Sequence, residues 1–406
     1  MSHPVLVLGG GIGGITAALE LAEAGGEVIL VEKEPYLGGN VSRFNNYFPK
    51  LCPPSCGLEI NYRRIRSNPR ITVHVSTTLE QVEGSAGAFE VLLRSGAPLI
   101  NDRCTACGKC AEVCPEDRAR ETGYDSEGKA AYIRDGITFP VKYTIDERAC
   151  LKEACARCVD ACAYDAIRLD AVPFTIRKTV HAIIVATGWH SYEAEKLENY
   201  RYGDDPDVMT NLEFEYWLAS GLKEQKGLNR PSGGTPPKRV AFVQCAGSRD
   251  LHHLAYCSSV CCSASIKHAL TLAEHTPETE VEIFYIDLRL TGRNETLLRK
   301  AASAASITLT KGKVGRITRK AAGDALEVEV EDILKGTRRR GHFDMVVLAT
   351  GLVPNHPGPE WPAGPEGFLI AGGTPGIVPA GTCKRPMDVA STVRDATAAA
   401  LKTMHL

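Results

Sequence analysis

The sequence predicts an α/β fold of the dinucleotide-binding type with a small inserted iron–sulfur domain. A strand, a glycine turn and a helix follow one another over residues 5–24, as at the start of a Rossmann domain. Two apolar strands that each end in Ala-Thr-Gly, at 182–188 and 345–351, repeat one pattern and favour two such domains. Two four-cysteine runs, within 104–114 and 150–162, have the spacing of iron–sulfur ligands.

The glycine turn predicts a dinucleotide site at the amino terminus. Gly9 permits the tight turn, Gly11 lets the backbone approach a pyrophosphate, and Gly14 allows the helix to pack closely. The helix amino terminus offers unpaired N–H groups to the phosphates. Glu32 follows the second strand, 28–31, at the distance expected for a carboxylate that binds an adenosine ribose. An acid there disfavours a 2′-phosphate, so the ligand is FAD or NAD rather than NADP.

The paired Ala-Thr-Gly strands resemble those of thioredoxin-reductase-like flavoproteins, in which each of two nucleotide domains ends in such a strand. That resemblance implies FAD in the amino-terminal domain. Residues 376–382, before a helical stretch at about 387–402, look like the segment that returns to the flavin in that group. Gly381-Thr382 stands where many members have Gly-Asp, which puts the ribityl contact of that acid in question. The candidate FAD-binding residues are Gly9, Gly11, Gly14, Glu32, Lys33, Gly39, Asn40, Gly188, Gly381 and Thr382.

The two cysteine runs predict two 4Fe-4S clusters in a ferredoxin-like domain. In the bacterial ferredoxin run the fourth cysteine binds the other cluster. A zinc ribbon or a disulfide frame is disfavoured, because zinc sites seldom use four-cysteine runs and nothing suggests export. The second run has four residues between Cys150 and Cys155 instead of two, which should alter the hydrogen bonding of that cluster. The expected sets are Cys104, Cys107, Cys110 and Cys162, and Cys150, Cys155, Cys158 and Cys114.

A third group of cysteines stands where a second dinucleotide site would begin. The strand 239–243 leads into Gln244-Cys245-Ala246-Gly247-Ser248-Arg249 instead of a GxGxxG loop. The close backbone approach that a second dinucleotide needs is therefore missing, and a pyridine nucleotide is not expected here. Four thiols are close enough in sequence to converge at a strand end and a helix start: Cys245, Cys257, Cys261 and Cys262.

The chain resembles the flavin-containing A subunits of heterodisulfide reductases and their relatives, through the segments 244–249 and 256–262. The resemblance implies that these four cysteines bind an additional, unusual cubane. Within the family the chain is most similar to the A subunits of quinone-interacting membrane-bound oxidoreductases, and it lacks the terminal extensions of full-length heterodisulfide reductase A subunits. The residues that carry this finer likeness, besides the cysteine layout, lie at 36–39, 47–54, 57–61 and 284–289.

This resemblance implies an electron-transfer subunit that is catalytic only inside a complex. The implied partners are a haem-bearing membrane subunit together with a paralogous subunit that carries flavin and iron–sulfur centres. Electrons would pass between a menaquinone pool and adenylylsulfate (APS) reductase in dissimilatory sulfur metabolism. The alternatives are a flavin-bifurcating subunit of a soluble heterodisulfide reductase complex and, less favoured, a self-contained NADH-dependent flavoprotein reductase.

Several further residues are candidates for a role. Lys267 is placed where the family has a lysine near flavin N5, and a cation there would raise the flavin potential; the alternative is a solvated helix lysine. Cys52 and Cys56 are expected to be packed or loop cysteines rather than a redox pair, and Cys383 a packed residue. The pair 252–253 is expected in a solvated loop, and the basic run 335–340 at an exposed hairpin cap.

Length and charge limit the function classes. A chain of 406 residues with net charge −2 is expected to fold as about two to three domains and shows no basic footprint for nucleic acid. No apolar stretch is long enough to span a membrane, so we expect a cytoplasmic protein. The resemblance implies that it meets the membrane only through partner subunits. The predicted domains are 1–98, 173–236 and 354–406 for FAD, 99–172 for the ferredoxin insert and 237–353 for the second Rossmann-like domain.

Overall fold

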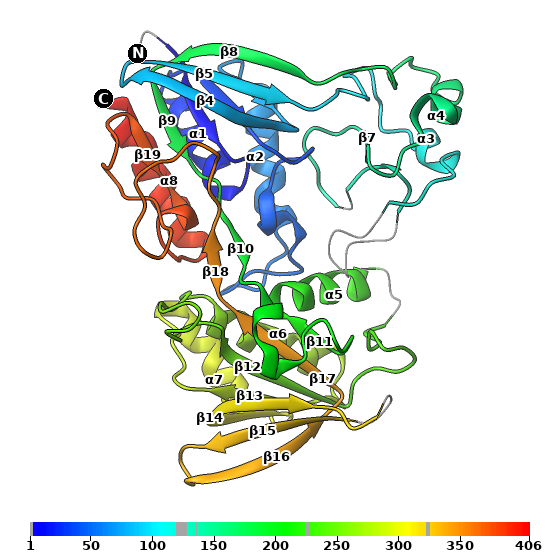
Figure 1. Cartoon of the computed structure of the whole chain (residues 1–406), viewed down its shortest axis with the longest axis vertical. Coiled ribbons are helices and arrows are strands. Elements are labelled where there is room, and N and C mark those ends of the chain that lie inside the picture. The colour runs from blue at the N-terminus through cyan, green and yellow to red at the C-terminus, as the bar shows by residue number, and fades with distance from the viewer. Residues whose placement is uncertain (1–2, 119–127, 135, 224–226, 322–324) are drawn as a thin grey trace.

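The computed structural model describes residues 3–118, 128–134, 136–223, 227–321 and 325–406. It confirms the predicted α/β class. Two lobes lie one above the other and are joined by a pair of crossing strands (Figure 1). In this pair β10 (Trp189–Ser191) runs antiparallel to β18 (Leu352–Pro354). Each crossing strand directly follows one of the two repeated Ala-Thr-Gly strands. In each lobe the chain therefore leaves the sheet directly after the Ala-Thr-Gly sequence and crosses toward the other lobe.

The first lobe is built on a five-stranded parallel sheet. The apolar strand β1 (Val5–Leu8) is flanked by β2 (Val28–Val31) and β9 (Ala182–Val185), and all three are completely buried. Strands with apolar residues on both faces are expected in a parallel sheet covered on both sides. The strand order is β19 (Ile377–Pro379), β9, β1, β2 and β3 (Ile71–His74).

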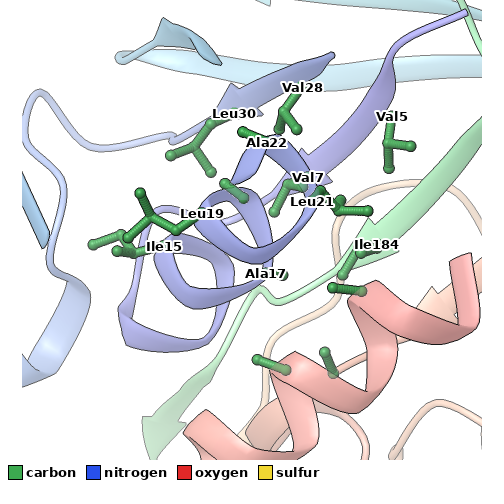
Figure 2. Close-up of a cluster of buried hydrophobic side chains, with 14 of the residues drawn as sticks. Val5, Val7, Ile15, Ala17, Leu19, Leu21, Ala22, Val28, Leu30 and Ile184 are labelled. Atoms are coloured by element: carbon green, nitrogen blue, oxygen red, sulfur yellow. The ribbon is translucent and has the colours of Figure 1, made fainter. Parts of the chain in front are cut away.

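Helix α1 (Ile12–Glu23) packs between this sheet and the carboxy-terminal helix α8 (Val389–Met404). Its apolar side chains gather between the strands and α8 (Figure 2). Alanines at positions 396, 399 and 400 of α8 are buried in the same cluster, and their small size lets the two helices approach closely. Helix α2 (Ser55–Ser67) adds Leu58, Tyr62 and Ile65 to this core.

An antiparallel meander carries the ferredoxin insert, as the predicted residues 99–172 are called here. The meander consists of β4 (Thr77–Ser85), β5 (Ala88–Ser95) and β8 (Phe174–Val180), and the insert leaves between β5 and β8. The insert has its own apolar cluster, which includes Leu99, Ile145 and Ile167. In the described residues of the insert the regular elements are short: α3 (Lys109–Glu112), β6 (Ala131–Tyr132), β7 (Thr144–Ile145), the 3-10 helix η2 (Lys152–Ala154) and α4 (Arg157–Asp160).

The second lobe contains a seven-stranded sheet that begins earlier than residue 237. Strand β11 (Val208–Thr210) lies at its edge and pairs with β17 (Met345–Thr350). Three residues are too few to show a strand periodicity, so the sequence did not reveal β11. The strand order is β11, β17, β12 (Arg239–Ala246), β13 (Glu280–Tyr285), β14 (Ile307–Thr318), β15 (Leu326–Asp332) and β16 (Thr337–Phe343). The helices are α5 (Asn211–Lys223), α6 (Cys261–His275) and α7 (Glu295–Ser303).

The structure corrects the predicted position of the basic run 335–340. A hairpin is present between β15 and β16, but the three arginines lie within strand β16 rather than at its cap. Arg340 pairs with Glu327 and Glu329 on the neighbouring strand, and Arg339 bonds to Glu282. Cross-strand charge pairs of this kind stabilise a sheet edge. In the described parts of the chain, no helix is long and apolar enough to cross a membrane.

Candidate flavin cavity and cysteine clusters

A cavity of about 570 Å³ lies between the two lobes and receives residues from both. It extends from the glycine turn after β1, past the crossing strands, to the wall formed by α5 and α6. Nine of the ten candidate FAD-binding residues line it, and so does Lys267; Gly14 stands behind its wall. The predicted residues in the lining are Gly9, Gly11, Glu32, Lys33, Gly39, Asn40, Gly188, Gly381, Thr382 and Lys267.

The glycine turn is packed so tightly that side chains are excluded. Gly9 has φ +100°, and a Cβ there would lie 2.3 Å from the carbonyl oxygen of Ala186. A Cβ on Gly14 would lie 1.7 Å from the carbonyl oxygen of Gly9. This contact holds the start of α1 against the turn and leaves the amino terminus of the helix facing the cavity. The arrangement fits a pyrophosphate, which binds helix amino termini.

Gly14→Ala is expected to lower the free energy of unfolding by about 1–3 kcal/mol, the usual cost of forcing a methyl group into a packed interior. FAD content should fall with it, because the turn must move. Gly315→Ala in β14 is the matched control, since its Cβ would meet nothing within 4 Å. Chemical denaturation and flavin absorbance of both variants check this, and a Gly14→Ala protein as stable and as flavin-loaded as the control would contradict it.

Glu32 is held in one orientation at the end of β2. Its carboxylate accepts hydrogen bonds from the backbone N–H of Gly10, at 2.6 Å, and of Glu34, at 2.9 Å. Burial raises the pKa of Glu32, and these two N–H donors oppose that effect. The carboxyl group therefore lies fixed in the cavity wall beside the glycine turn, where it can bind a ribose hydroxyl as predicted.

The loop that carries Gly39 and Asn40 meets the glycine turn directly. The N–H of Gly38 donates to the carbonyl of Gly10 at 2.7 Å. A Cβ on Gly39 would lie 3.1 Å from the Cα of Gly11. Asn40 Nδ2 donates to the carbonyl of Trp189 in β10 at 3.1 Å. The two backbones approach as closely as glycine allows, and together they form a cradle for the middle of an elongated ligand.

The carboxy-terminal segment closes the cavity from the side of α8. The N–H of Gly381 donates to Asp395 Oδ2 at 2.9 Å, and Lys384 Nζ bonds the other carboxylate oxygen at 2.7 Å. Thr382 is buried and lines the cavity. Cys383 is fully buried, with its Sγ 3.0 Å from the carbonyl oxygen of Val185. This confirms the prediction that Cys383 is a packed residue. Burial raises the pKa of Cys383 to about 11.

Lys267 is buried at the far end of the cavity rather than solvated. Its Nζ donates to the carbonyl of Asn46 at 2.8 Å and pairs with Glu215 of α5. Glu215 also bonds His268 Nε2 and accepts from the backbone N–H of Asn45 at 2.9 Å. The group thus ties α5 and α6 of the second lobe to a loop of the first.

The charges in this buried group depend on one another. Burial alone would raise the pKa of Glu215, but the adjacent Lys267 and His268 lower it well below its usual range. Burial lowers the pKa of Lys267, and the Glu215 carboxylate opposes that change. Burial and the nearby lysine also lower the pKa of His268. The lysine therefore keeps a cationic Nζ in the cavity wall only as long as Glu215 is ionised beside it.

The ferredoxin insert brings its eight cysteines together in the two predicted groups. A small hollow is lined by Cys104, Cys107, Cys110 and Cys162, the whole first set. Burial raises the pKa of Cys110 to about 12. Burial also raises the pKa of Cys158, and the neighbouring thiols that add to this effect are the other members of the second set: Cys150, Cys114 and Cys155. Buried thiols with raised pKa values become thiolate ligands when iron is bound.

The third group of cysteines converges where β12 ends and α6 begins. Burial raises the pKa of Cys261 well above its usual value, and the three other thiols of the group add to this effect. Cys245 has φ +58°, an unusual backbone conformation for a residue with a side chain. Arg249 lies beside Cys245 and is anchored to Asp287 at 2.8 Å. Cys261 and Cys262 form the first turn of α6, whose dipole favours negative charge.

No group of three or more His, Cys, Asp or Glu side chains is arranged to hold a single metal ion in the part of the chain that the structure describes. A cubane binds each thiolate to a different iron, so its ligands stand farther apart than those of one ion. The three cysteine groups have the donor chemistry for cubanes, and their ligand roles stay predictions.

The remaining candidates lie at the edges of the site. Cys52 is half-buried in the loop before α2, as expected, whereas Cys56 is exposed in the first turn of α2 and is therefore neither packed nor in a loop. That the two thiols do not form a redox pair stays a prediction. His252 is exposed, as expected for a solvated loop, whereas His253 is half-buried, which differs from the prediction. Its Nδ1 lies 2.8 Å from the hydroxyl of Tyr192, which lines the cavity.

Sequence reasoning missed several ionisable residues of the cavity wall, among them Arg43, Arg134, Glu215 and His268. Neither Glu215 nor Arg134 stands in a motif. Their partners are distant in sequence, as Lys267 is from Glu215, so only the folded chain reveals them. His268 directly follows the predicted Lys267, and this adjacency was the one available signal.

Comparison with known proteins identifies two domain families. Residues 4–88 match the FAD dependent oxidoreductase family, and residues 97–117 match the 4Fe-4S binding domain. Two solved thioredoxin reductases share the fold. That of T. acidophilum has a TM-score of 0.56 at 13% identity, over 99% of this chain and 98% of its own. That of Lactococcus lactis has a TM-score of 0.55 at 14% identity, over 100% of this chain and 98% of its own. The predicted thioredoxin-reductase-like fold with a ferredoxin insert is confirmed.

Curated relatives match nearly the whole chain. The iron-sulfur A subunit of the CoB--CoM heterodisulfide reductase of Methanocaldococcus jannaschii is 34% identical over 97% of this chain. The second such A subunit of Methanopyrus kandleri is 36% identical over 98%. The A subunit of the H(2):CoB-CoM heterodisulfide,ferredoxin reductase of Methanothermobacter marburgensis is 35% identical over 98%. The chain spans 63% of the length of each of these relatives.

Proposed function

Because the homologues of this chain are A subunits of heterodisulfide reductases, we propose that it is an FAD and iron–sulfur electron-transfer subunit. One observation carries the proposal. The cavity that starts at the glycine turn ends against α6, the helix that begins with Cys261 and Cys262. Lys267 lies five residues farther along α6, a rise of about 7.5 Å along a helix. The flavin end of the cavity and the third cysteine group thus share one helix.

When bound, FAD and the clusters supply the exchange between two-electron and one-electron chemistry. The chain's own residues position them and set the local charge. Glu32 and the glycine cradle fix the adenosine and pyrophosphate end, as the hydrogen bonds around Gly10 and Gly38 support. Lys267 supplies a positive charge at the other end, where reduction adds negative charge.

The second lobe is poorly suited to a nicotinamide coenzyme. Cys245 at the end of β12 and Arg249 after it both have positive φ, and the chain between β12 and α6 forms no glycine loop at the helix start. Helix α6 instead opens with two buried cysteines. We therefore propose that electrons reach the flavin from protein partners through the clusters, with the ferredoxin insert as one route.

We propose that the chain belongs to a complex of the quinone-interacting membrane-bound oxidoreductase type. The partners would be a haem-bearing membrane subunit together with a paralogous subunit that carries flavin and iron–sulfur centres, linking menaquinone with APS reductase at the membrane surface. The motifs at 36–39, 47–54 and 284–289 support this choice. A second candidate is a flavin-bifurcating subunit of a soluble heterodisulfide reductase complex. The names of the curated relatives support the heterodisulfide reductase part of this candidate.

Two measurements on the purified native complex test the proposal. We expect anaerobic NADH to leave the flavin absorbance unchanged, because the second lobe offers no pyrophosphate loop, while dithionite bleaches it as the control. Bleaching by NADH at a catalytic rate would contradict the proposal. A haem-containing membrane subunit in the same complex would favour the quinone-linked version, and a soluble complex with heterodisulfide reductase activity would favour the second candidate.

A further inference from the structure

The ferredoxin insert contributes a side chain to the flavin cavity. Arg134 follows β6 of the insert, and it lines the cavity together with Arg43 of the first lobe. Arg43 ends the short 3-10 helix η1 (Gly39–Arg43), which begins at the glycine that meets the glycine turn. The guanidinium carbon of Arg43 lies 5.9 Å from the centre of the Tyr216 ring of α5, and Arg43 is close enough to Arg134 to lower its pKa. Two guanidinium groups from different domains therefore line the same cavity.

Hydrogen bonds hold the insert against the loop that bears this cradle. The hydroxyl of Tyr36 donates to the carbonyl of Lys142 at 2.9 Å and lies 3.3 Å from that of Tyr132. The N–H of Leu37 donates to the carbonyl of Phe139 at 2.8 Å. Tyr36 and Leu37 directly precede the two glycines of the cradle, so the insert supports that loop from behind.

Arg134 is fixed in the same contact. Its guanidinium carbon lies 5.2 Å from the centre of the Tyr36 ring, within cation–π range. Tyr36 is itself 1% exposed. The aromatic face therefore holds the arginine at the cavity wall instead of letting it extend into solvent.

The electrostatics of this wall favour an anion. Burial lowers the pKa of Arg134, and the positive charge of Arg43 lowers it further, while the Glu34 carboxylate opposes both effects. Two like charges in a partly buried wall repel each other unless a negative group lies between them. The amino terminus of α1, a helix of twelve residues, faces the same part of the cavity with its unpaired N–H groups. Arg134, Arg43 and the helix amino terminus thus each add positive potential to this cavity, against the carboxylates of Glu32 and Glu34 in its lining.

We propose that Arg134 of the ferredoxin insert binds the diphosphate of FAD, together with Arg43 and the amino terminus of α1. The inference rests on the proposed flavin function and adds a consequence to it. The insert is then part of the FAD site, and FAD fixes the position of the two predicted ferredoxin clusters relative to the flavin. A guanidinium suits this role because its fork can donate two hydrogen bonds to phosphate oxygens.

Flavin affinity tests the arginine directly. FAD is removed from the full chain and added back anaerobically, and its dissociation constant is measured for wild type, Arg134→Gln and Arg177→Gln. Arg177 is an exposed arginine of β8, just outside the insert, and serves as the matched control. We expect Arg134→Gln to bind FAD at least roughly tenfold more weakly, the loss expected for a hydrogen bond to a charged group. Affinities within twofold of the control would overturn the proposal.

Amide hydrogen exchange of the unmodified protein provides a second test that does not depend on a variant folding. FAD should slow exchange in residues 131–134 and 136–145 of the insert at least severalfold, because Arg134 would be held by the ligand. Unchanged exchange there, with slowed exchange at the glycine turn, would overturn the proposal while leaving the FAD site intact. A wild-type chain that binds no FAD at all would instead contradict the proposed function.

Discussion

Replacing Cys261 by alanine is expected to remove about four irons per chain, the content of one cubane, and to leave FAD bound. Cys261 is 8% exposed and lies with the other three cysteines of the third group at the start of α6. Removing one of the four thiolates leaves one iron without its cysteine ligand, so we expect the cluster to be lost. Iron, acid-labile sulfide and flavin, measured anaerobically on variant and wild type, give the answer.

Cys56→Ala is the control for this experiment, because Cys56 is exposed at the start of α2 and belongs to none of the three groups. It should keep the full iron content. Equal iron in the Cys261→Ala and Cys56→Ala proteins would show that the third group binds no cluster. Loss of both iron and FAD from the Cys261 variant alone would instead indicate a structural role for this cysteine.

The second large effect is expected on the flavin potential. Lys267→Met should lower the two-electron potential of the flavin by about 30–60 mV, which corresponds to about 1.5–3 kcal/mol for a lost charged interaction. The physical reason is that a buried cation in the cavity wall stabilises reduced, anionic flavin. An anaerobic redox titration followed by flavin absorbance measures the shift, and an unchanged potential would rule out this role for Lys267.

Interpreting the flavin potential of Lys267→Met requires a second variant in which Glu215 is changed as well. Removing Lys267 alone leaves the Glu215 carboxylate buried with only His268 and backbone N–H donors, which is costly. The Lys267→Met, Glu215→Gln double variant removes both charges and should be the more stable of the two. Its flavin potential should fall between those of Lys267→Met and wild type. A double variant with a lower potential than Lys267→Met would contradict the electrostatic account.

Local patterns predicted the elements that place the flavin. The glycine turn, the strand before it and the two Ala-Thr-Gly strands are each specified by a few adjacent residues. Gly14 illustrates why: its Cβ would overlap the Gly9 carbonyl, so the helix can pack only with glycine there. The cysteine spacing was equally informative, because the first ligand set forms one hollow in the folded insert.

Contacts between distant segments could not be predicted in this way. Glu215 reaches Lys267 across 52 positions, and Arg134 meets Tyr36 only because the insert folds back onto the first lobe. Strand β11 was missed for a different reason, since three residues carry no periodic signal. The arginines of β16 looked like a solvent-exposed cap because their carboxylate partners lie on other strands.

We propose that this chain holds one flavin and three cubanes, two in the insert and one beside the flavin cavity. The most direct test of this proposal is the anaerobic iron, sulfide and flavin content of the native protein. We expect about twelve irons and twelve sulfides per chain with one FAD, at four of each per cubane. About eight irons with one FAD would contradict the third cluster and leave the cysteines at the start of α6 without their proposed role.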